Sequence, residues 1–337
     1  MLQLDNRTPY EAENAVLLDI DGSEIWVVAV KATFDIKNGE PELADEQEPV
    51  CLVDEYFGEP GISSLKYEGE LVFKKPGTDV AINGHAYAPH GRPVSKLDAQ
   101  IRIGDRRKTI RVFGDRYWKG SIGGLSISSP QAFTQMPIGY ERAFGGTDLS
   151  DEDPKKQGAE ARNPIGAGFA MTEAVLKDRP LPNFEDPADQ VKSWKSRPNP
   201  AGLGFTCKHW EPRRQYIGTC DQDYIENRLP LYPLDFDFRY FLGASPDLTF
   251  SPHLKGGEPV ELHNLTSDGY LAFHLPRVWL GFRTSLEGRW VNHRGTLGSV
   301  VIEPDAPRVV MTWQTCLPCH RKTFELEETR IFEKRVV

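Results

Sequence analysis

The stretch Met136 to Asp148 reads MPIGYERAFGGTD and lies near the middle of the 337-residue chain. Its residues Pro137, Gly139, Gly145 and Gly146 interrupt any helical or strand periodicity, and neighbouring glycines allow positive φ angles and close backbone approach. One Tyr, one Glu, one Arg and one Phe stand between them. The pattern predicts an ordered loop held by aromatic anchors. Two alternatives stay open: a structural turn packed on a sheet, or a loop that faces a partner.

A turn-rich region, residues 121–233, surrounds this stretch. Asn-Pro, Leu-Pro and Arg-Pro pairs recur along it. Short helices are predicted at Met171–Lys177 and at Pro187–Trp194, where Asp186 is the expected N-cap and Pro occupies the first helical position. Long loops in a compact chain usually carry a function. We therefore expect this centre to pack against the parts on either side.

Strand patterns fill residues 1–120. The run Glu24–Ile36, EIWVVAVKATFDI, is apolar on both faces, which predicts a central strand. Further predicted strands are Tyr67–Lys74, Asp79–Tyr87 and a hairpin of Ala99–Ile103 with Thr109–Phe113. The first part of the chain is therefore predicted to be a β-sheet region.

The strand pattern returns over residues 234–337. The run Asp235–Phe241, DFDFRYF, alternates charged and aromatic residues, which predicts a half-buried strand with Asp235 and Asp237 on one face. Other short strands are predicted at Val260–Leu262, Tyr270–Leu275, Val278–Arg283, Trp290–Asn292, Val300–Glu303 and Val309–Thr315. Regular short strands with turn signals favour an antiparallel β-sandwich or barrel-like sheets. The sequence thus predicts a mainly β protein with a loop-rich centre and few short helices, folded as one cooperative body.

Composition excludes several classes of function. The formal net charge of -9 argues against a nucleic-acid partner, because binding phosphates needs a basic surface. No apolar run approaches the roughly 18 residues of a membrane span. The first residues lack the basic and apolar regions of a signal peptide, and the five cysteines are an odd number. We therefore expect a cytoplasmic protein with reduced thiols and no membrane partner.

A C-x-x-C-H pattern at Cys316, Cys319 and His320 has the form of a c-type haem attachment signature. We reject haem, because no export signal is present and the pattern follows a β-rich run. A zinc site is chemically conceivable, since Cys207-x-His209 and Cys316-x-x-Cys319 both have ligand-like spacing. These two pairs lie about a hundred residues apart in the sequence. We expect neither metal nor cofactor. The candidate ligands are Cys207, His209, Cys220, Cys316, Cys319 and His320.

Catalytic motifs are missing: the chain has no G-x-S-x-G, no P-loop and no dinucleotide fingerprint. We therefore predict that the protein is not an enzyme. One alternative is a carbohydrate-active or hydrolytic β-sandwich that uses Asp235, Asp237 or Cys319. Another is a carbohydrate-binding module, which would expose three tryptophans together on a flat face: Trp118, Trp194 and Trp210.

Several motifs occur in one order along the chain: YERAFGGTD, Asn163-Pro164, LPNFE at 181–185, GLGF at 202–205, WEPR at 210–213 and DFD at 235–237. Together they resemble a bacterial domain-of-unknown-function family whose members accompany type VI secretion effectors and PAAR-like spike-tip proteins. The resemblance covers about Ser23 to Arg321. It implies a cytoplasmic adaptor or chaperone that binds a PAAR-like effector or spike-tip protein. The chain departs from the family at Cys220, where an aromatic residue is usual.

Aromatic and arginine side chains are the usual anchors of protein interfaces. The predicted partner-binding residues are Tyr140, Glu141, Arg142, Phe144, Trp210 and Arg213. The same residue types also hold loops together from inside a protein, so interface and scaffold both remain open for them.

Overall fold

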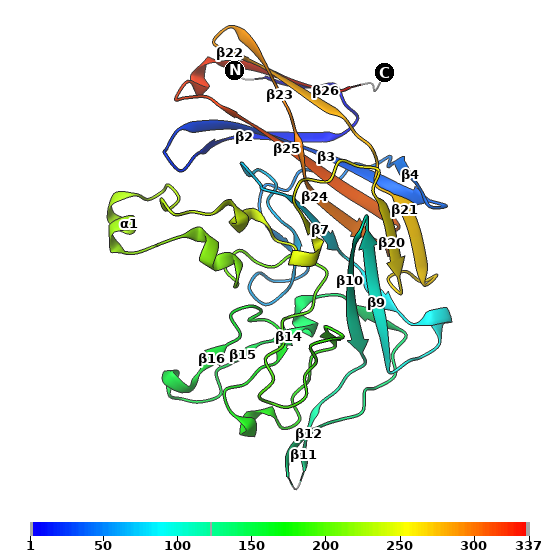
Figure 1. Ribbon diagram of the computed structural model, residues 1–337. Helices are drawn as coiled ribbons and strands as arrows, with labels where there is room; N and C mark the ends of the chain where they lie inside the picture. Colours follow the sequence, from blue (N-terminus) through cyan, green and yellow to red (C-terminus); the bar gives the residue numbers. More distant parts are fainter. Residues whose placement is uncertain (1–2, 122, 335–337) are drawn as a thin grey trace.

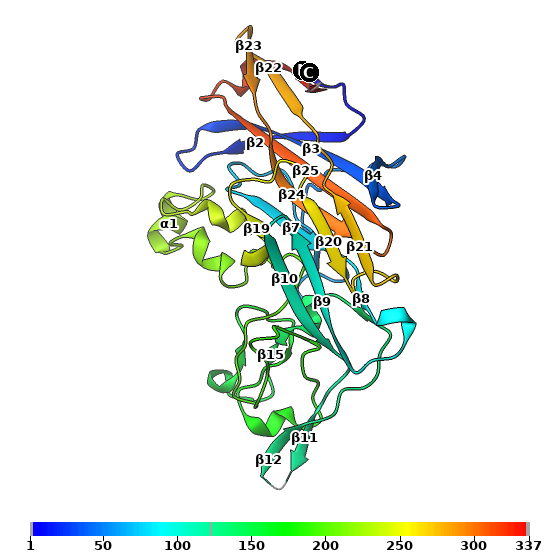
Figure 2. The ribbon, with the colours of Figure 1, turned by 45° about the vertical axis from the view of Figure 1, so that its right-hand side comes forward.

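The computed structural model describes residues 3–121 and 123–334 (Figure 1). The protein is mainly β, as predicted, and consists of several largely antiparallel sheets that form no closed barrel. Figure 2 shows the sheets following one another along a long axis, with the green part of the loop-rich centre at one end. Both chain ends lie at the opposite end of the molecule.

The largest sheet has seven strands, in the order β19-β7-β24-β25-β3-β2, with β4 also paired to β3. Its central strand β3 is buried almost throughout, because Val, Ile, Trp and Phe cover both of its faces. This confirms the predicted central strand. The strands are β2 (Glu11–Leu18), β3 (Glu24–Lys37), β4 (Glu40–Leu43), β7 (Thr78–Ile82), β19 (Thr249–Phe250), β24 (Thr296–Glu303) and β25 (Arg308–Pro318).

Strands from the N- and C-terminal regions of the chain pair with one another in this sheet. β3 pairs with β25 in antiparallel register from Ile25–Pro318 to Asp35–Arg308, and β7 pairs with β24 in parallel. The N- and C-terminal strand regions therefore share hydrogen bonds and a core, so neither buries its apolar residues without the other.

A five-stranded sheet, ordered β18-β10-β9-β20-β21, lies between the large sheet and the central loops. The predicted hairpin is confirmed in β9 and β10, whose inward residues Ile101, Ile103, Ile110 and Val112 are all fully buried. The strands are β9 (Lys96–Ile103), β10 (Arg106–Phe113), β18 (Phe184–Glu185), β20 (Pro259–His263) and β21 (Tyr270–His274).

A four-stranded sheet, ordered β1-β26-β22-β23, covers the far side of the large sheet. Its strands are β1 (Gln3–Asn6), β22 (Leu280–Leu286), β23 (Arg289–His293) and β26 (Leu326–Glu333). Two-stranded pairs complete the β structure: β5 (Glu55–Tyr56) with β6 (Leu65–Tyr67), β8 (His85–Tyr87) with β13 (Gln135–Pro137), β11 (Trp118–Ser121) with β12 (Gly124–Ile127), β14 (Phe144–Gly145) with β17 (Ala167–Gly168), and β15 (Thr147–Asp148) with β16 (Gly158–Ala159).

Helical structure is sparse. The described residues contain one α-helix, α1 (Gln222–Asn227), on a lobe that projects from the body (Figure 1). The 3-10 turns are η1 (Pro89–Gly91), η2 (Tyr140–Arg142), η3 (Pro154–Lys156), η4 (Glu173–Leu176), η5 (Arg213–Ile217), η6 (Phe238–Phe241), η7 (Pro246–Leu248) and η8 (Thr323–Glu325). The helix predicted at Met171–Lys177 is thus only the short turn η4.

The helix predicted at Pro187–Trp194 is wrong. The Asp186 side chain accepts a hydrogen bond from the Ala188 backbone N–H, 2.7 Å away, and closes a tight turn instead of capping a helix. Asp side chains often satisfy nearby backbone donors in this way, which competes with helix formation.

The half-buried strand predicted at Asp235–Phe241 is also wrong. Asp237 accepts a hydrogen bond from the Arg239 N–H and begins the turn η6, and the Asp235 carboxylate accepts from the Thr219 N–H. The alternation reflects aromatic residues that pack beside Phe73 in a small core, not a strand. The two carboxylates therefore have separate partners.

The strand predicted at Tyr67–Lys74 is wrong beyond Tyr67. After β6, the side chains of Glu68 and Glu70 both turn inward and pair with cations, and Lys74 adopts a positive φ of 53°. The strand predicted at Asp79–Tyr87 divides at Asn83 and Gly84 into β7 and β8, which belong to different sheets.

His293 joins the four-stranded sheet to the large one. Its Nε2 lies 2.8 Å from Thr284 Oγ1 in β22, and its Nδ1 lies 2.7 Å from Thr315 Oγ1 in β25. Burial lowers the pKa of His293 to about 4, so the folded protein holds it neutral at pH 6, where an unfolded chain takes up a proton.

This histidine predicts an acid-sensitive fold. The stability that depends on a neutral His293 is complete above pH 6.5 and is lost as the pH falls towards 4. We expect the free energy of unfolding to fall by about 2 kcal/mol between pH 7 and 4.5. Urea unfolding at pH 7 and at pH 4.5 measures this loss of stability. His293→Gln is expected to flatten the dependence of stability on pH, and the exposed His90→Gln is expected to keep it. An unchanged slope in His293→Gln would contradict this assignment.

Candidate functional site

The central stretch is ordered, as predicted, and Asn163 holds it from inside. This fully buried side chain donates through Nδ2 to the Tyr140 and Phe144 carbonyl oxygens, at 2.7 and 3.0 Å. A Cβ at Gly145, where φ is +155°, would lie only 2.1 Å from the Asn163 carbonyl oxygen. The loop therefore closes around Asn163 at a position that has no room for a larger residue than Gly.

The six residues predicted to bind a partner divide into two sets. Four are buried: Tyr140 packs edge-to-face on Trp210 with ring centroids 5.6 Å apart, Phe144 lies in a second small core, and Arg213 pairs with Glu68 at 2.7 Å. These four hold the loops together. Glu141 and Arg142 are the two that reach the surface.

Glu141 and Arg142 contact different neighbours rather than each other. Both oxygens of the Glu141 carboxylate accept hydrogen bonds from Ser64, one from its backbone N–H at 2.5 Å and one from its hydroxyl. The Arg142 Nη1 donates to Asn183 Oδ1 at 3.1 Å and lies 3.8 Å from Asp115. Glu141 thus ties the central stretch to the segment that precedes β6.

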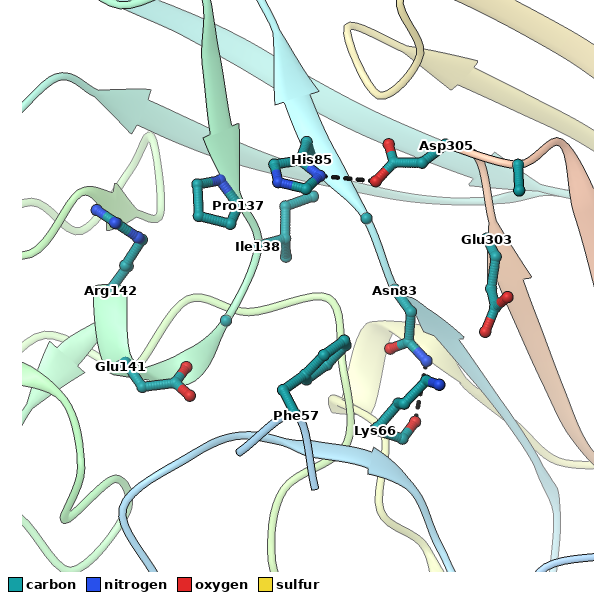
Figure 3. A pocket seen from close by; sticks show the side chains of 13 residues that line it. Phe57, Lys66, Asn83, His85, Pro137, Ile138, Glu141, Arg142, Glu303 and Asp305 are labelled. Atoms are coloured by element: carbon teal, nitrogen blue, oxygen red, sulfur yellow. Dashed lines mark hydrogen bonds and ion pairs between the residues drawn. The ribbon is translucent and has the colours of Figure 1, made fainter. Parts of the chain in front are cut away.

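A groove of about 420 Å³ lies where these elements meet (Figure 3). Phe57 stands on one side, the β8–β13 pair on another, and the turn after β24 on a third. This volume is within the range of ligand pockets, and most of the surface is apolar. The lining residues are Phe57, Lys66, Asn83, Gly84, His85, Pro137, Ile138, Gly139, Glu141, Arg142, Glu303, Asp305 and Ala306.

Hydrogen bonds fix the acidic side of the groove. Asp305 accepts from the Tyr87 hydroxyl at 2.8 Å and lies 2.6 Å from Nδ1 of His85. Desolvation and the neighbouring Asp305 raise the pKa of Tyr87 to about 12, which keeps its hydroxyl a donor. Glu303 accepts from the Tyr67 hydroxyl and from Arg308 Nε, so its charge is already balanced.

An exposed apolar segment borders the groove, and we name residues 52–62 the apolar rim. Leu52, Val53, Phe57 and Ile62 each expose half or more of their surface. Large apolar side chains gathered on one loop of a soluble protein mark interaction sites. Residues 40–59 also carry eight Asp or Glu and no Lys or Arg, and three of these acids, Asp54, Glu55 and Glu59, lie in the rim itself.

The candidate metal ligands, for which we expect no metal, lie in different settings. Cys207 and Cys319 are buried, the Cys319 thiol donates to the Leu317 carbonyl oxygen at 3.4 Å, and His320 is exposed on a turn with a φ of 49°. Across the part of the chain that the structure describes, no group of three or more His, Cys, Asp and Glu is placed to hold a metal ion. Cys220 is exposed.

The cysteines predict a graded reactivity. Burial raises the pKa of Cys51 to about 12 and that of Cys207 to about 11, so neither forms a thiolate at pH 8 in the folded protein. We expect a thiol reagent to label the exposed Cys220 first, and Cys51 and Cys207 only on unfolding. Mass spectrometry of peptides after timed alkylation checks this order, and early labelling of Cys51 would contradict it.

The residues of the two alternative functions do not come together. Trp118 and Trp210 are buried in separate cores, so they form no exposed flat face with Trp194. Asp235 accepts from the Thr219 N–H, and Asp237 pairs with Arg239 at 2.5 Å. Phe57, Asn83 and Asp305 were not predicted as site residues, and the acidic, apolar run over 40–62 is the sequence feature that could have indicated this region.

No helix within residues 3–121 and 123–334 has the length and apolar character needed to cross a membrane. The fold and the groove define a mainly β protein whose candidate site is an apolar, acid-bordered depression beside the hydrogen-bonded central loop. Residues 21–314 match the model of a family described as "Uncharacterized protein conserved in bacteria (DUF2169)". This is most of the chain, so the protein belongs to that family. No curated protein matches the chain, and no solved structure does.

Proposed function

We propose that this protein is an accessory adaptor of type VI secretion, which binds a PAAR-like effector in the bacterial cytoplasm and aids its loading onto the secretion spike. The motif resemblance supports this role. The observation that carries it is the apolar rim beside the groove, where Leu52, Val53, Phe57 and Ile62 are exposed and belong to none of the hydrophobic clusters found among the described residues. An apolar surface of this kind is suited to covering another protein.

The rim is well placed for such a contact because its base is rigid. Ser64, just after the rim, donates two hydrogen bonds to Glu141, and β6 pairs with β5. Lys208 pairs with Asp54 at 2.8 Å within the rim itself. A preorganised loop loses less conformational entropy on binding than a mobile one, so its apolar side chains contribute more of their burial energy to the complex.

Chaperoning follows from the same surface. A client that exposes apolar residues before it joins the spike would cover them on the rim, and would leave when the spike covers them instead. The adaptor then needs no chemical step. Its affinity must be high enough to prevent aggregation and lower than that of the assembled spike for the same client surface.

Co-expression with a PAAR-like effector from the same bacterium tests this function. We expect the two chains to co-purify through size-exclusion chromatography, and we expect deletion of the adaptor to leave the client aggregated and unsecreted. A client that is soluble and secreted without the adaptor, and that forms no complex with it, would refute the proposal.

A further inference from the structure

Asn83 carries the one buried side-chain polar atom of the groove lining that has no hydrogen-bond partner among the described residues. The side chain is 6% exposed, and Nδ2 donates to the Lys66 carbonyl oxygen at 2.9 Å. Its Oδ1 is buried and has no hydrogen-bond partner among the described residues. Figure 3 shows this oxygen directed into the groove on the side of Phe57 and Ile138. Buried acceptors are nearly always paired, so this oxygen is suited to a donor that a ligand brings.

The carboxylates of the groove indicate the charge of that ligand. Within the described chain, no Lys, Arg or His nitrogen lies within 4 Å of the Glu141 carboxylate, and the partners of Asp305 are His85 and the neutral Tyr87 hydroxyl. The groove also has two cations, but Arg142 donates outward to Asn183, and Lys66 lies over the face of the Tyr67 ring. The acceptors that remain for a ligand are therefore Asn83 Oδ1 and the Glu141 carboxylate.

The apolar walls of the groove indicate the shape of the ligand. Phe57 is 51% exposed and stands over the groove, with Ile138 and Pro137 opposite (Figure 3). A guanidinium is planar, stacks on aromatic faces, carries five donors and is more weakly hydrated than an ammonium. Its aliphatic stem packs on apolar walls. An arginine side chain therefore satisfies both the walls and the acceptors.

We propose that this groove is a recognition pocket for an arginine side chain of the client, an inference that rests on the proposed adaptor function. The guanidinium stacks on Phe57 and donates to Asn83 Oδ1 and to the Glu141 carboxylate. The acidic run over residues 40–59 complements a basic client segment and guides its approach. The pocket selects one side chain, while the apolar rim supplies the larger contact.

The probe is N-acetylarginine amide, titrated by NMR at low salt against its neutral isostere, N-acetylcitrulline amide. We expect saturable shifts with arginine, at least about five-fold weaker binding of citrulline, and weakening by added salt. Phe57→Ala and Glu141→Gln should each weaken arginine binding, and Glu141→Gln keeps an acceptor for Ser64. Glu59→Gln, an exposed acid of the same rim that does not line the groove, is the matched control and should bind as the wild type does.

Equal binding of the two probes, or equal binding by wild type and Glu141→Gln, would overturn the arginine pocket. The client complex separates this failure from that of the adaptor function. A complex of equal affinity with wild type and with Glu141→Gln leaves the adaptor and removes the pocket. Arginine binding without any client complex leaves the pocket and removes the adaptor.

Discussion

Arg213→Met is expected to lower the free energy of unfolding by about 3–5 kcal/mol, because it leaves buried charge uncompensated. Arg213 is 3% exposed, pairs with Glu68 at 2.7 Å, and donates to the Tyr240 carbonyl oxygen at 2.9 Å. Lys75 stays near Glu68, but it already pairs with the buried Asp79 at 2.8 Å. Without the guanidinium, the buried Lys75 ammonium is left beside two buried carboxylates, those of Glu68 and Asp79.

The neighbouring residue supplies the control for this prediction. Arg214 is exposed, so Arg214→Met removes the same charge from the same turn and should change stability by no more than about 0.5 kcal/mol. Chemical unfolding of the three proteins at pH 7 measures both effects. Equal stability of the two variants would show that Arg213 does not hold the segment around Tyr240 to Glu68, the residue that follows β6.

Asn163→Asp is expected to cost about 3 kcal/mol at pH 7, although it changes the side chain by a single atom. The Nδ2 group now donates to the carbonyl oxygens of Tyr140 and Phe144. A carboxylate offers no donor, so both buried carbonyls lose their partner and face a negative charge. Burial should raise the pKa of the new Asp, so the loss is smallest below pH 4 and grows as the pH rises towards 7.

A second Asn-Pro pair of the central region provides the comparison. Asn199 is exposed, and its Oδ1 accepts from Arg162 at 2.7 Å, a hydrogen bond that a carboxylate keeps. Asn199→Asp should therefore stay within about 0.5 kcal/mol of the wild type, without a comparable pH dependence. If Asn163→Asp is as stable as Asn199→Asp across pH 4 to 7, then Asn163 does not organise the central loop.

The strands of this fold could be predicted where apolar residues alone decide them. The run in β3 is apolar on both faces, and the β9–β10 hairpin alternates cleanly around a Gly-containing turn. Their partners could not be predicted, because β3 finds β25 nearly 300 residues away and nothing local encodes that pairing. Predictions also failed where an Asp side chain accepts a hydrogen bond from the backbone N–H two residues later, as at Asp186 and Asp237.

The candidate site was harder to predict for the same reason. The groove takes Phe57, Asn83, Glu141 and Asp305 from four segments, and each is unremarkable within its own segment. The glycines and aromatic residues around Tyr140 led to the prediction of partner-binding residues there. In the structure those features build the support, with Tyr140 and Trp210 buried against each other, while the accessible surface lies on the less conspicuous rim.

The affinity of the client for Phe57→Asp, compared with Phe324→Asp, tests the account most directly. Both phenylalanines are exposed, at 51% and 79%, and both changes add one negative charge. Phe57 borders the groove, whereas Phe324 lies in η8, which contributes no residue to it. We expect Phe57→Asp to raise the Kd of the client complex by roughly 100-fold and Phe324→Asp by no more than about two-fold. Equal affinities for the two variants, with both folded, would contradict the claim that this protein acts through the rim and its groove.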